Sequence, residues 1–248
     1  MTYDFHPPRP FLRAHWRHLV MFNYEIAPGV LAPLVPPGTE LDDFNGRLFV
    51  SLIGFQFLKA SLFHIPIPLH QHFVEVNLRF YVKHEAADGW HHGVVFIREM
   101  VPHAAISLGA SLFYNEPYRT LPLREQVVLA GADSGAAGHV RYEWLLHQHW
   151  QHLEAMTEGT PAPLVPGSEA DFIATRHWGY GTFHDGRGIE YHVTHPRWNI
   201  WSVHRHSLRC DVAALYGQRF VAPLSQTPAS VFVADGSEVS VSRWRGMS

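Results

Sequence analysis

The feature that most restricts the fold of this chain is a strict alternation of apolar and polar residues between Phe73 and Lys83. The apolar set consists of Val74, Val76, Leu78, Phe80 and Val82, and the polar set consists of Glu75, Asn77, Arg79 and Tyr81. Because side chains alternate between the two faces of a strand, the pattern predicts a β-strand with chemically opposite faces. The polar face either meets solvent or lines the interior of a closed sheet, and the alternation alone favours neither.

A second predicted strand, Gly93–Val101, follows closely and carries Arg98 and Glu99 beside apolar residues. Carboxylates and guanidiniums therefore stand on adjacent strands. Leaving one such charge buried and unpaired costs on the order of 3–5 kcal/mol. On an interior face these charges must pair with one another, meet water, or bind a ligand.

The rest of the chain also favours strands. They are predicted at Trp16–Ile26, Arg47–Leu58, Val127–Ala130, Val140–Leu146 and Ile189–His195, with short helices at Pro28–Leu34 and Ser168–Ala174. The proline-rich segment Ile65–Leu69 is expected to be a loop. Asp235-Gly236, between two short apolar runs, predicts a hairpin turn. Many short strands with few helices indicate a mainly β (α+β) fold, an antiparallel barrel or sandwich with helical additions.

Composition excludes several classes of protein. The formal charge of −3, without a basic run, is not that of a nucleic-acid-binding protein. No segment reaches the roughly 18 apolar residues of a membrane span, and no signal pattern is present, so we expect a soluble, cytoplasmic protein. The single Cys210 excludes an internal disulfide. We expect residues 1–248 to form one domain, and the high aromatic content is compatible with a homo-oligomer.

Histidine, with 20 residues, supplies a further candidate chemistry. Close groups occur at His147, His149 and His152, at His70 and His72, and at His204 and His206. Such groups often bind transition metals, but none has the His-Glu-x-x-His arrangement of a zinc enzyme. A histidine-bound metal enzyme therefore stays open as an alternative, although we assign no metal ligand.

Nucleophiles and cofactor motifs are scarce. Lys59 and Lys83 are the only lysines, and neither a Gly-x-Ser-x-Gly elbow nor a Ser-x-x-Lys pair occurs. The glycines between Gly179 and Gly188 lack the spacing of a dinucleotide-binding loop, so we expect no cofactor.

Five motifs occur in the order typical of a known bacterial family. They are Glu75–Arg79, Arg98–Pro102, Tyr114–Tyr118, His195–Trp198 and Val231–Gly236. Together they resemble the family designated domain of unknown function twenty seventy-one, over nearly the whole chain. That family is similar, more distantly, to acetoacetate decarboxylase. The resemblance implies a cone-shaped antiparallel β-barrel with a few short helices and a polar, carboxylate-lined cavity.

The resemblance also implies site residues. Glu75 corresponds to a cavity glutamate of the decarboxylase, and Arg98-Glu99 resembles a pair that precedes its lysine-bearing segment. There the decarboxylase has a proline and paired lysines, one of which forms a Schiff base, whereas this chain reads Met100-Val101-Pro102-His103-Ala104-Ala105. Without that amine the electron sink for decarboxylation is missing, so the resemblance extends to the fold and the cavity but not to the reaction.

We therefore expect a cavity that binds a small polar or carboxylate-bearing molecule. Glu75 and Glu99 are the candidate catalytic acid and base, and Asn77, Arg79, Arg98 and Tyr118 are the candidate substrate-binding residues. If the protein is an enzyme, it is lyase-like and works without a Schiff base. The main alternative is a non-catalytic ligand-binding or sensing protein.

Overall fold

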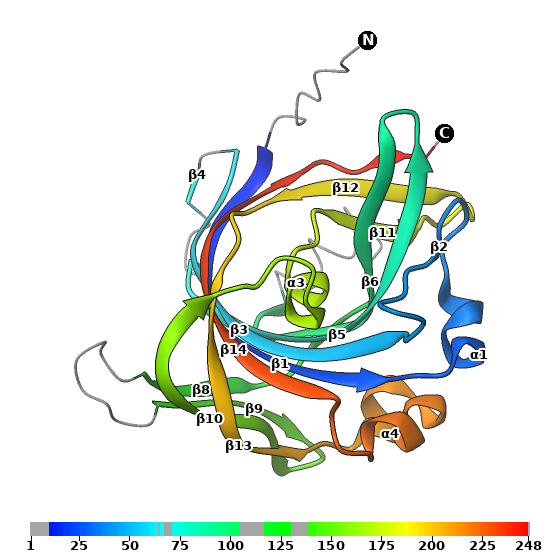
Figure 1. The fold of residues 1–248 in the computed structure, drawn as a ribbon. Helices are drawn as coiled ribbons and strands as arrows, with labels where there is room; N and C mark the ends of the chain where they lie inside the picture. Colours follow the sequence, from blue (N-terminus) through cyan, green and yellow to red (C-terminus); the bar gives the residue numbers. More distant parts are fainter. Residues whose placement is uncertain (1–9, 64, 67–70, 105–116, 130–137, 248) are drawn as a thin grey trace.

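The core of the molecule is a closed ring of strands. The computed structural model describes residues 10–63, 65–66, 71–104, 117–129 and 138–247. Within this part of the chain, seven strands close into a ring, and all neighbours are antiparallel except β6 and β11. In ring order they are β1 (Pro10–Glu25), β3 (Phe49–Leu62), β5 (Phe73–Ala86), β6 (Gly89–Val101), β11 (Trp178–Thr182), β12 (Gly188–Thr194) and β14 (Ser230–Ser242) (Figure 1).

A second layer of strands packs on the outside of the ring. It contains β13 (Asn199–Arg209), β10 (His149–Pro163), β9 (Gly138–Leu146) and β8 (Leu123–Val128), and it joins the ring through β14. The apolar side chains of β5, such as Val76 and Leu78, share one buried cluster with Tyr142 and Trp144 of β9. The short helices α1 (Pro28–Leu31), α4 (Val212–Tyr216) and α5 (Val221–Leu224) add Leu31, Leu215 and Leu224 to the same cluster. The smallest elements are η1 (Ala32–Leu34), η2 (Gln218–Phe220), β2 (Glu40–Leu41), β4 (Ile65–Pro66), β7 (Tyr118–Thr120) and β15 (Arg245–Gly246).

One helix lies inside the ring. Helix α3 (Glu169–Ala174) sits within the circle of strands (Figure 1) and buries Ile173 in the cluster formed by Ile53 and Phe55 of β3. Its first turn is capped by Ser168, whose Oγ accepts a hydrogen bond from Asp171 N at 3.2 Å. The helix predicted at Ser168–Ala174 is thus confirmed, and it forms one wall of the ring interior.

The mainly β prediction is confirmed, as is the strand over residues 73–83, which belongs to the longer β5. The prediction that Arg47–Leu58 is covered on both sides is also confirmed, because β3 is buried at consecutive positions from Phe49 to Phe55. Of the Ile65–Leu69 loop, Ile65–Pro66 pairs with β3, and residues 67–69 lie outside the described part. The strand predicted at Val127–Ala130 begins earlier, at Leu123.

The hairpin predicted at Asp235-Gly236 is wrong, because β14 runs through this dipeptide as one strand. Gly236 has a φ of +79° and lies opposite Arg17 of β1. A Cβ atom at Gly236 would lie 2.0 Å from the carbonyl oxygen of Trp16. The glycine therefore serves a close backbone approach at an irregular point of a continuous strand, a use of Asp-Gly that local sequence does not separate from a turn.

Among the helices that the structure describes, none is long and apolar enough to cross a lipid bilayer.

Candidate functional site

The polar face of β5 is buried inside the ring. Exposed fractions are 3% for Glu75, 2% for Asn77, 8% for Arg79 and 1% for Tyr81. Glu75 lies opposite Phe55 and Asn77 opposite Ile53, both of which pack in the cluster that contains α3. The sequence left open whether this face meets solvent or the interior, and the structure places it inside.

Strand β6 adds a second carboxylate to this face. Glu99 is paired directly with Asn77 across the antiparallel ladder, so their side chains lie on the same side with Cβ atoms roughly 5 Å apart. Tyr118 of β7 is in register with Glu99 in a parallel pair. Glu75, Asn77, Arg79, Glu99 and Tyr118 are thus brought together at one end of the β5–β6–β7 sheet.

Arg98 does not join them. It is paired with Leu78, whose side chain belongs to the outer cluster, so its side chain lies on the opposite face of the sheet. There it lies close to Tyr216 of α4. Burial raises the pKa of this phenol, and the positive charge of Arg98 acts in the opposite direction. The expectation that Arg98 and Glu99 line one cavity is therefore not met by the geometry, because consecutive strand residues face opposite ways.

Hydrogen bonds leave part of the buried polar face unsatisfied. Asn77 Nδ2 donates to Glu75 Oε1 at 2.9 Å, and Arg79 Nη2 donates to the carbonyl oxygen of Ile173 in α3 at 3.1 Å. In the part of the chain that the structure describes, Arg79 Nε and Asn77 Oδ1 are buried and have no hydrogen-bond partner. Arg79 also forms no ion pair with any residue of that part.

A hydrogen-bonded chain fixes the remaining polar residue, Tyr81. Its hydroxyl lies 2.6 Å from Ser51 Oγ, and Ser51 donates to Asn23 Oδ1 at 2.7 Å. Asn23 in turn donates to Ser230, which donates to the carboxylate of Glu169. Because an ionised carboxylate only accepts, the direction of the whole chain is set, and the Tyr81 hydroxyl donates to Ser51.

Two further residues of the interior, Asp42 and Arg176, were not predicted from the sequence. Arg176, just after α3, is 6% exposed and donates from Nη1 to Asp42 Oδ2 at 2.7 Å. His92 Nδ1 contacts the same Asp42 oxygen at 2.7 Å. Burial alone would raise the pKa of Asp42, but the hydrogen bond to His92 and the charge and hydrogen bond of Arg176 hold it below its usual value. Neither Asp42 nor Arg176 stands in a periodic pattern, so no sequence signal marked them.

His195 borders the same region. It is 8% exposed and stacks on Trp198 at 4.3 Å between ring centres. Burial, together with repulsion from His177 and Arg79, lowers its pKa to about 4, although the hydrogen bonds to the carbonyl oxygens of Pro196 and Arg176 act in the opposite direction. The ring is therefore neutral at pH 7. The run His195-Pro196-Arg197-Trp198, which also belongs to the family motifs, thus contributes one buried imidazole near Arg79.

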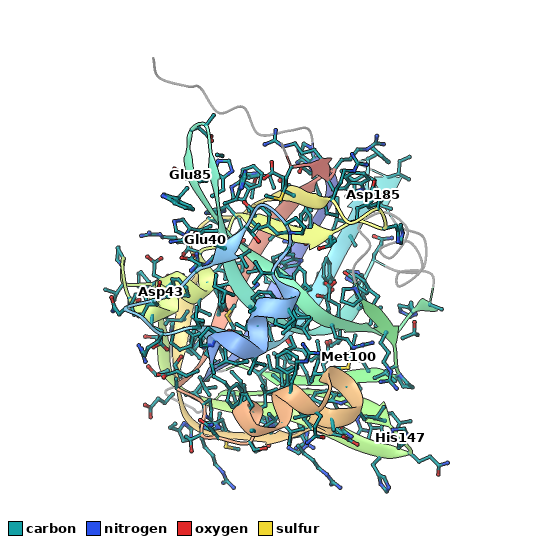
Figure 2. All side chains as sticks on the ribbon, turned by 90° about the vertical axis from the view of Figure 1, so that its right-hand side faces the viewer. Glu40, Asp43, Glu85, Met100, His147 and Asp185 are labelled. Atoms are coloured by element: carbon teal, nitrogen blue, oxygen red, sulfur yellow. The ribbon has the colours of Figure 1, made fainter. Side chains whose placement is uncertain are left out.

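Of the histidine groups noted in the sequence, the His147 group lies on the β9–β10 hairpin, His204 and His206 lie on β13, and His70 lies outside the described residues. His147 occupies the tip of the β9–β10 hairpin, at the far end of the molecule from Glu40 and Glu85 (Figure 2). Among the described residues, no group of three or more histidine, cysteine or acidic side chains is arranged to hold a metal ion. Both lysines also lie outside the polar cluster: Lys83 Nζ pairs with Glu40 at 3.1 Å, and Lys59 is exposed.

A separate pocket of about 510 Å³ opens on the outer side of the ring, between β1, β13 and the α4–α5 segment. Cys210 lines it, and burial raises the pKa of this thiol to about 12. The thiol is therefore protonated and a poor nucleophile at neutral pH.

The ring of strands has the acetoacetate decarboxylase-like fold, as superposition on solved structures shows. An acetoacetate decarboxylase-like enzyme from Sphingomonas wittichii RW1 superposes with a TM-score of 0.67 at 14% identity, covering 100% of this chain and 98% of that one. The enduracididine biosynthesis enzyme MppR complexed with pyruvate gives 0.66 at 15% identity, covering 100% and 93%. Acetoacetate decarboxylase from Legionella pneumophila gives 0.63 at 12% identity, covering 99% and 93%.

Within this fold, the chain belongs to the DUF2071 family of uncharacterised conserved proteins, whose model matches residues 13–238. The uncharacterised protein YqjF of Bacillus subtilis is 30% identical over 108 residues, which span 43% of each chain. The chain thus aligns with less than half of that curated relative.

Proposed function

We propose that the interior face formed by β5, β6 and β7 binds a small organic carboxylate, with Arg79 as the anchor of the carboxylate group. Glu75 and Glu99 then act as general acid and base on the carbon skeleton. No Schiff base is formed, because neither lysine lies with these residues.

The observation that carries the proposal is the state of Arg79. Its guanidinium is buried, makes one hydrogen bond to a backbone carbonyl, and keeps a buried Nε without a partner among the residues described. An uncompensated buried charge costs several kcal/mol. A carboxylate accepts parallel hydrogen bonds from the planar guanidinium, so an anionic ligand removes this cost.

The acid–base role is supported by the position of Glu75 and Glu99, which are both buried on the polar face that carries Arg79. Residues two apart on a strand face are separated by roughly 7 Å, so Asn77 and its cross-strand partner Glu99 stand nearer to Arg79 along the strands than Glu75 does. Asn77 Nδ2 holds one oxygen of Glu75. A glutamate in this position can remove a proton next to a carbonyl group of the ligand, leaving the electron pair on the carbonyl oxygen, and return a proton afterwards.

Pyruvate is the first probe, since the structural neighbour MppR is described in complex with it. We expect calorimetric titration to detect pyruvate binding that Arg79→Gln weakens about 10–100-fold, since a hydrogen bond to a charged group contributes about 1.5–3 kcal/mol. Arg197→Gln is the matched control, because that guanidinium is half-exposed and pairs with Asp171 outside the polar cluster. Equal pyruvate affinity of the wild type and Arg79→Gln would refute the proposal that Arg79 binds the carboxylate group.

Proton exchange separates an enzyme from a binding protein. In deuterated water, the glutamate removes a proton from the pyruvate methyl group, exchanges it with the solvent and returns a deuteron. NMR detects this replacement of hydrogen by deuterium. We expect Glu75→Gln to slow this exchange at least about tenfold while pyruvate stays bound, and Glu238→Gln, on the exposed surface, to leave it unchanged. Binding by the wild type without exchange selects the non-catalytic alternative.

A further inference from the structure

Arg176 offers a second set of hydrogen-bond donors in the ring interior. Its Nη1 is engaged by Asp42, whereas Nε and Nη2 are buried and have no partner among the described residues. In a guanidinium, Nε and Nη2 form one edge with parallel N–H bonds, the edge that binds a carboxylate in bidentate geometry. The free edge of Arg176 is therefore the one suited to an anion.

Arg176 and Arg79 both lie close to the aromatic ring of Tyr81. The Cζ atoms of Arg176 and Arg79 lie 5.2 and 5.8 Å from the centre of the Tyr81 ring, so their separation cannot exceed the sum of these distances. Burial lowers the pKa of Arg176, the charge of Asp42 raises it, and the charge of Arg79 lowers it further, as expected for two guanidiniums that share one region. The Cζ atom of Arg176 also lies 3.8 Å from the centre of the Phe172 ring, which covers one face of the guanidinium.

Asp42 contacts a second side chain besides Arg176. The same carboxylate oxygen contacts both Arg176 Nη1 and His92 Nδ1 at 2.7 Å. The Tyr81 hydroxyl donates its proton to Ser51, so it offers the region an acceptor and no competing donor. The interior thus holds two guanidiniums with buried N–H groups that have no partner among the described residues, and both lie against the Tyr81 ring.

We infer that Arg176 is a second anchoring residue and that the ligand is a short dicarboxylic acid, with one carboxylate on Arg79 and the other on the Nε/Nη2 edge of Arg176. This inference rests on the proposed carboxylate site. It adds a substrate class, because a single carboxylate leaves the Arg176 edge unpaired.

The test compares acids of equal length that differ in one carboxylate. Calorimetry measures the binding affinity of succinate and butyrate, and of glutarate and pentanoate. The proteins compared are the wild type, Arg176→Lys, Arg79→Gln and Arg197→Lys. Lysine keeps the charge beside Asp42 but lacks the bidentate edge. Near-ultraviolet circular dichroism verifies that each variant keeps the wild-type fold.

We expect one of the dicarboxylates to bind wild type at least tenfold more tightly than its monocarboxylate partner. Arg176→Lys should remove that advantage and leave the monocarboxylate affinity unchanged, Arg79→Gln should weaken both acids, and Arg197→Lys should change neither. Equal affinities within each pair, still dependent on Arg79, overturn the dicarboxylate inference and leave the carboxylate site standing. The absence of any binding, or binding independent of Arg79, overturns the proposed function as well.

Discussion

Removing the charge of Asp42 is the most direct test of how the ring interior is held together. Asp42→Asn preserves the shape of the side chain and an oxygen that accepts from Arg176 Nη1, but it deletes the counter-charge. The side chains of Asp42 and Arg176 are only 6% and 5% exposed, so water cannot replace the lost anion without a local opening. The variant therefore isolates the electrostatic part of the pair.

Breaking a buried ion pair by removing one partner costs about 3–5 kcal/mol. The retained hydrogen bond and the partial exposure of His92, the other partner of Asp42, place the expected loss near the lower limit, at about 3 kcal/mol. Urea denaturation followed by fluorescence measures it, and with a slope of about 3 kcal/mol per molar the midpoint should fall by about 1 M.

The control and the double variant decide the cause. Asp185→Asn breaks an exposed pair with Arg187 and should leave the urea midpoint nearly unchanged. If the loss arises from an uncompensated Arg176, then Asp42→Asn combined with Arg176→Met should be more stable than Asp42→Asn alone. A loss below about 1 kcal/mol for Asp42→Asn, or no recovery in the double variant, refutes this account.

Two further predictions concern the strands. Gly236→Ala should cost at least about 2 kcal/mol in urea denaturation, since it combines a positive φ with a clash against the Trp16 carbonyl. Gly186→Ala, with a φ of +84° and open space around the new methyl group, should cost about half as much, and equal losses would contradict the role of the close approach. For Glu154, burial raises the pKa, but hydrogen bonds from His139 and Ser207 and the charge of Arg141 lower it from 4.5 to about 2. Its contribution to stability is therefore full above pH 4.5 and lost as the pH falls toward 2, and Glu154→Gln should flatten this part of the stability-against-pH curve relative to the wild type.

The sequence predicted the chemistry of the β5 face but not its direction. Alternation identifies Glu75, Asn77 and Arg79 as one face, and only the closure of the ring, with α3 inside it, decides that this face is buried. The separation of Arg98 from Glu99 was within reach of the sequence, since consecutive strand residues face opposite ways. The family resemblance led to the prediction that both residues line one cavity, whereas the structure places them on opposite faces of β6.

Asp42 and Arg176 were out of reach for a different reason. Asp42 follows the two-residue strand β2, and Arg176 follows the short helix α3, so neither has periodic neighbours that predict a face. Their pairing joins positions 134 residues apart, and such contacts are fixed by ring closure alone. Likewise, Asp235-Gly236 is locally compatible with both a turn and an irregular strand, and the long partner β1 selects the strand.

The interior chemistry follows from what the ring supplies and from where it supplies it. In the proposed reaction, proton transfer needs a carboxylate beside the ligand, and Glu75 and Glu99 both stand on the buried polar face. Anchoring needs positive charge that survives burial, and arginine keeps its charge where lysine loses its own. A buried arginine is costly, and β5 carries Arg79 on its polar face while its other face packs against the second layer of strands. The apolar set of β5 therefore stabilises the strand whose other face carries the buried polar residues, and the alternation between Phe73 and Lys83 positions both sets.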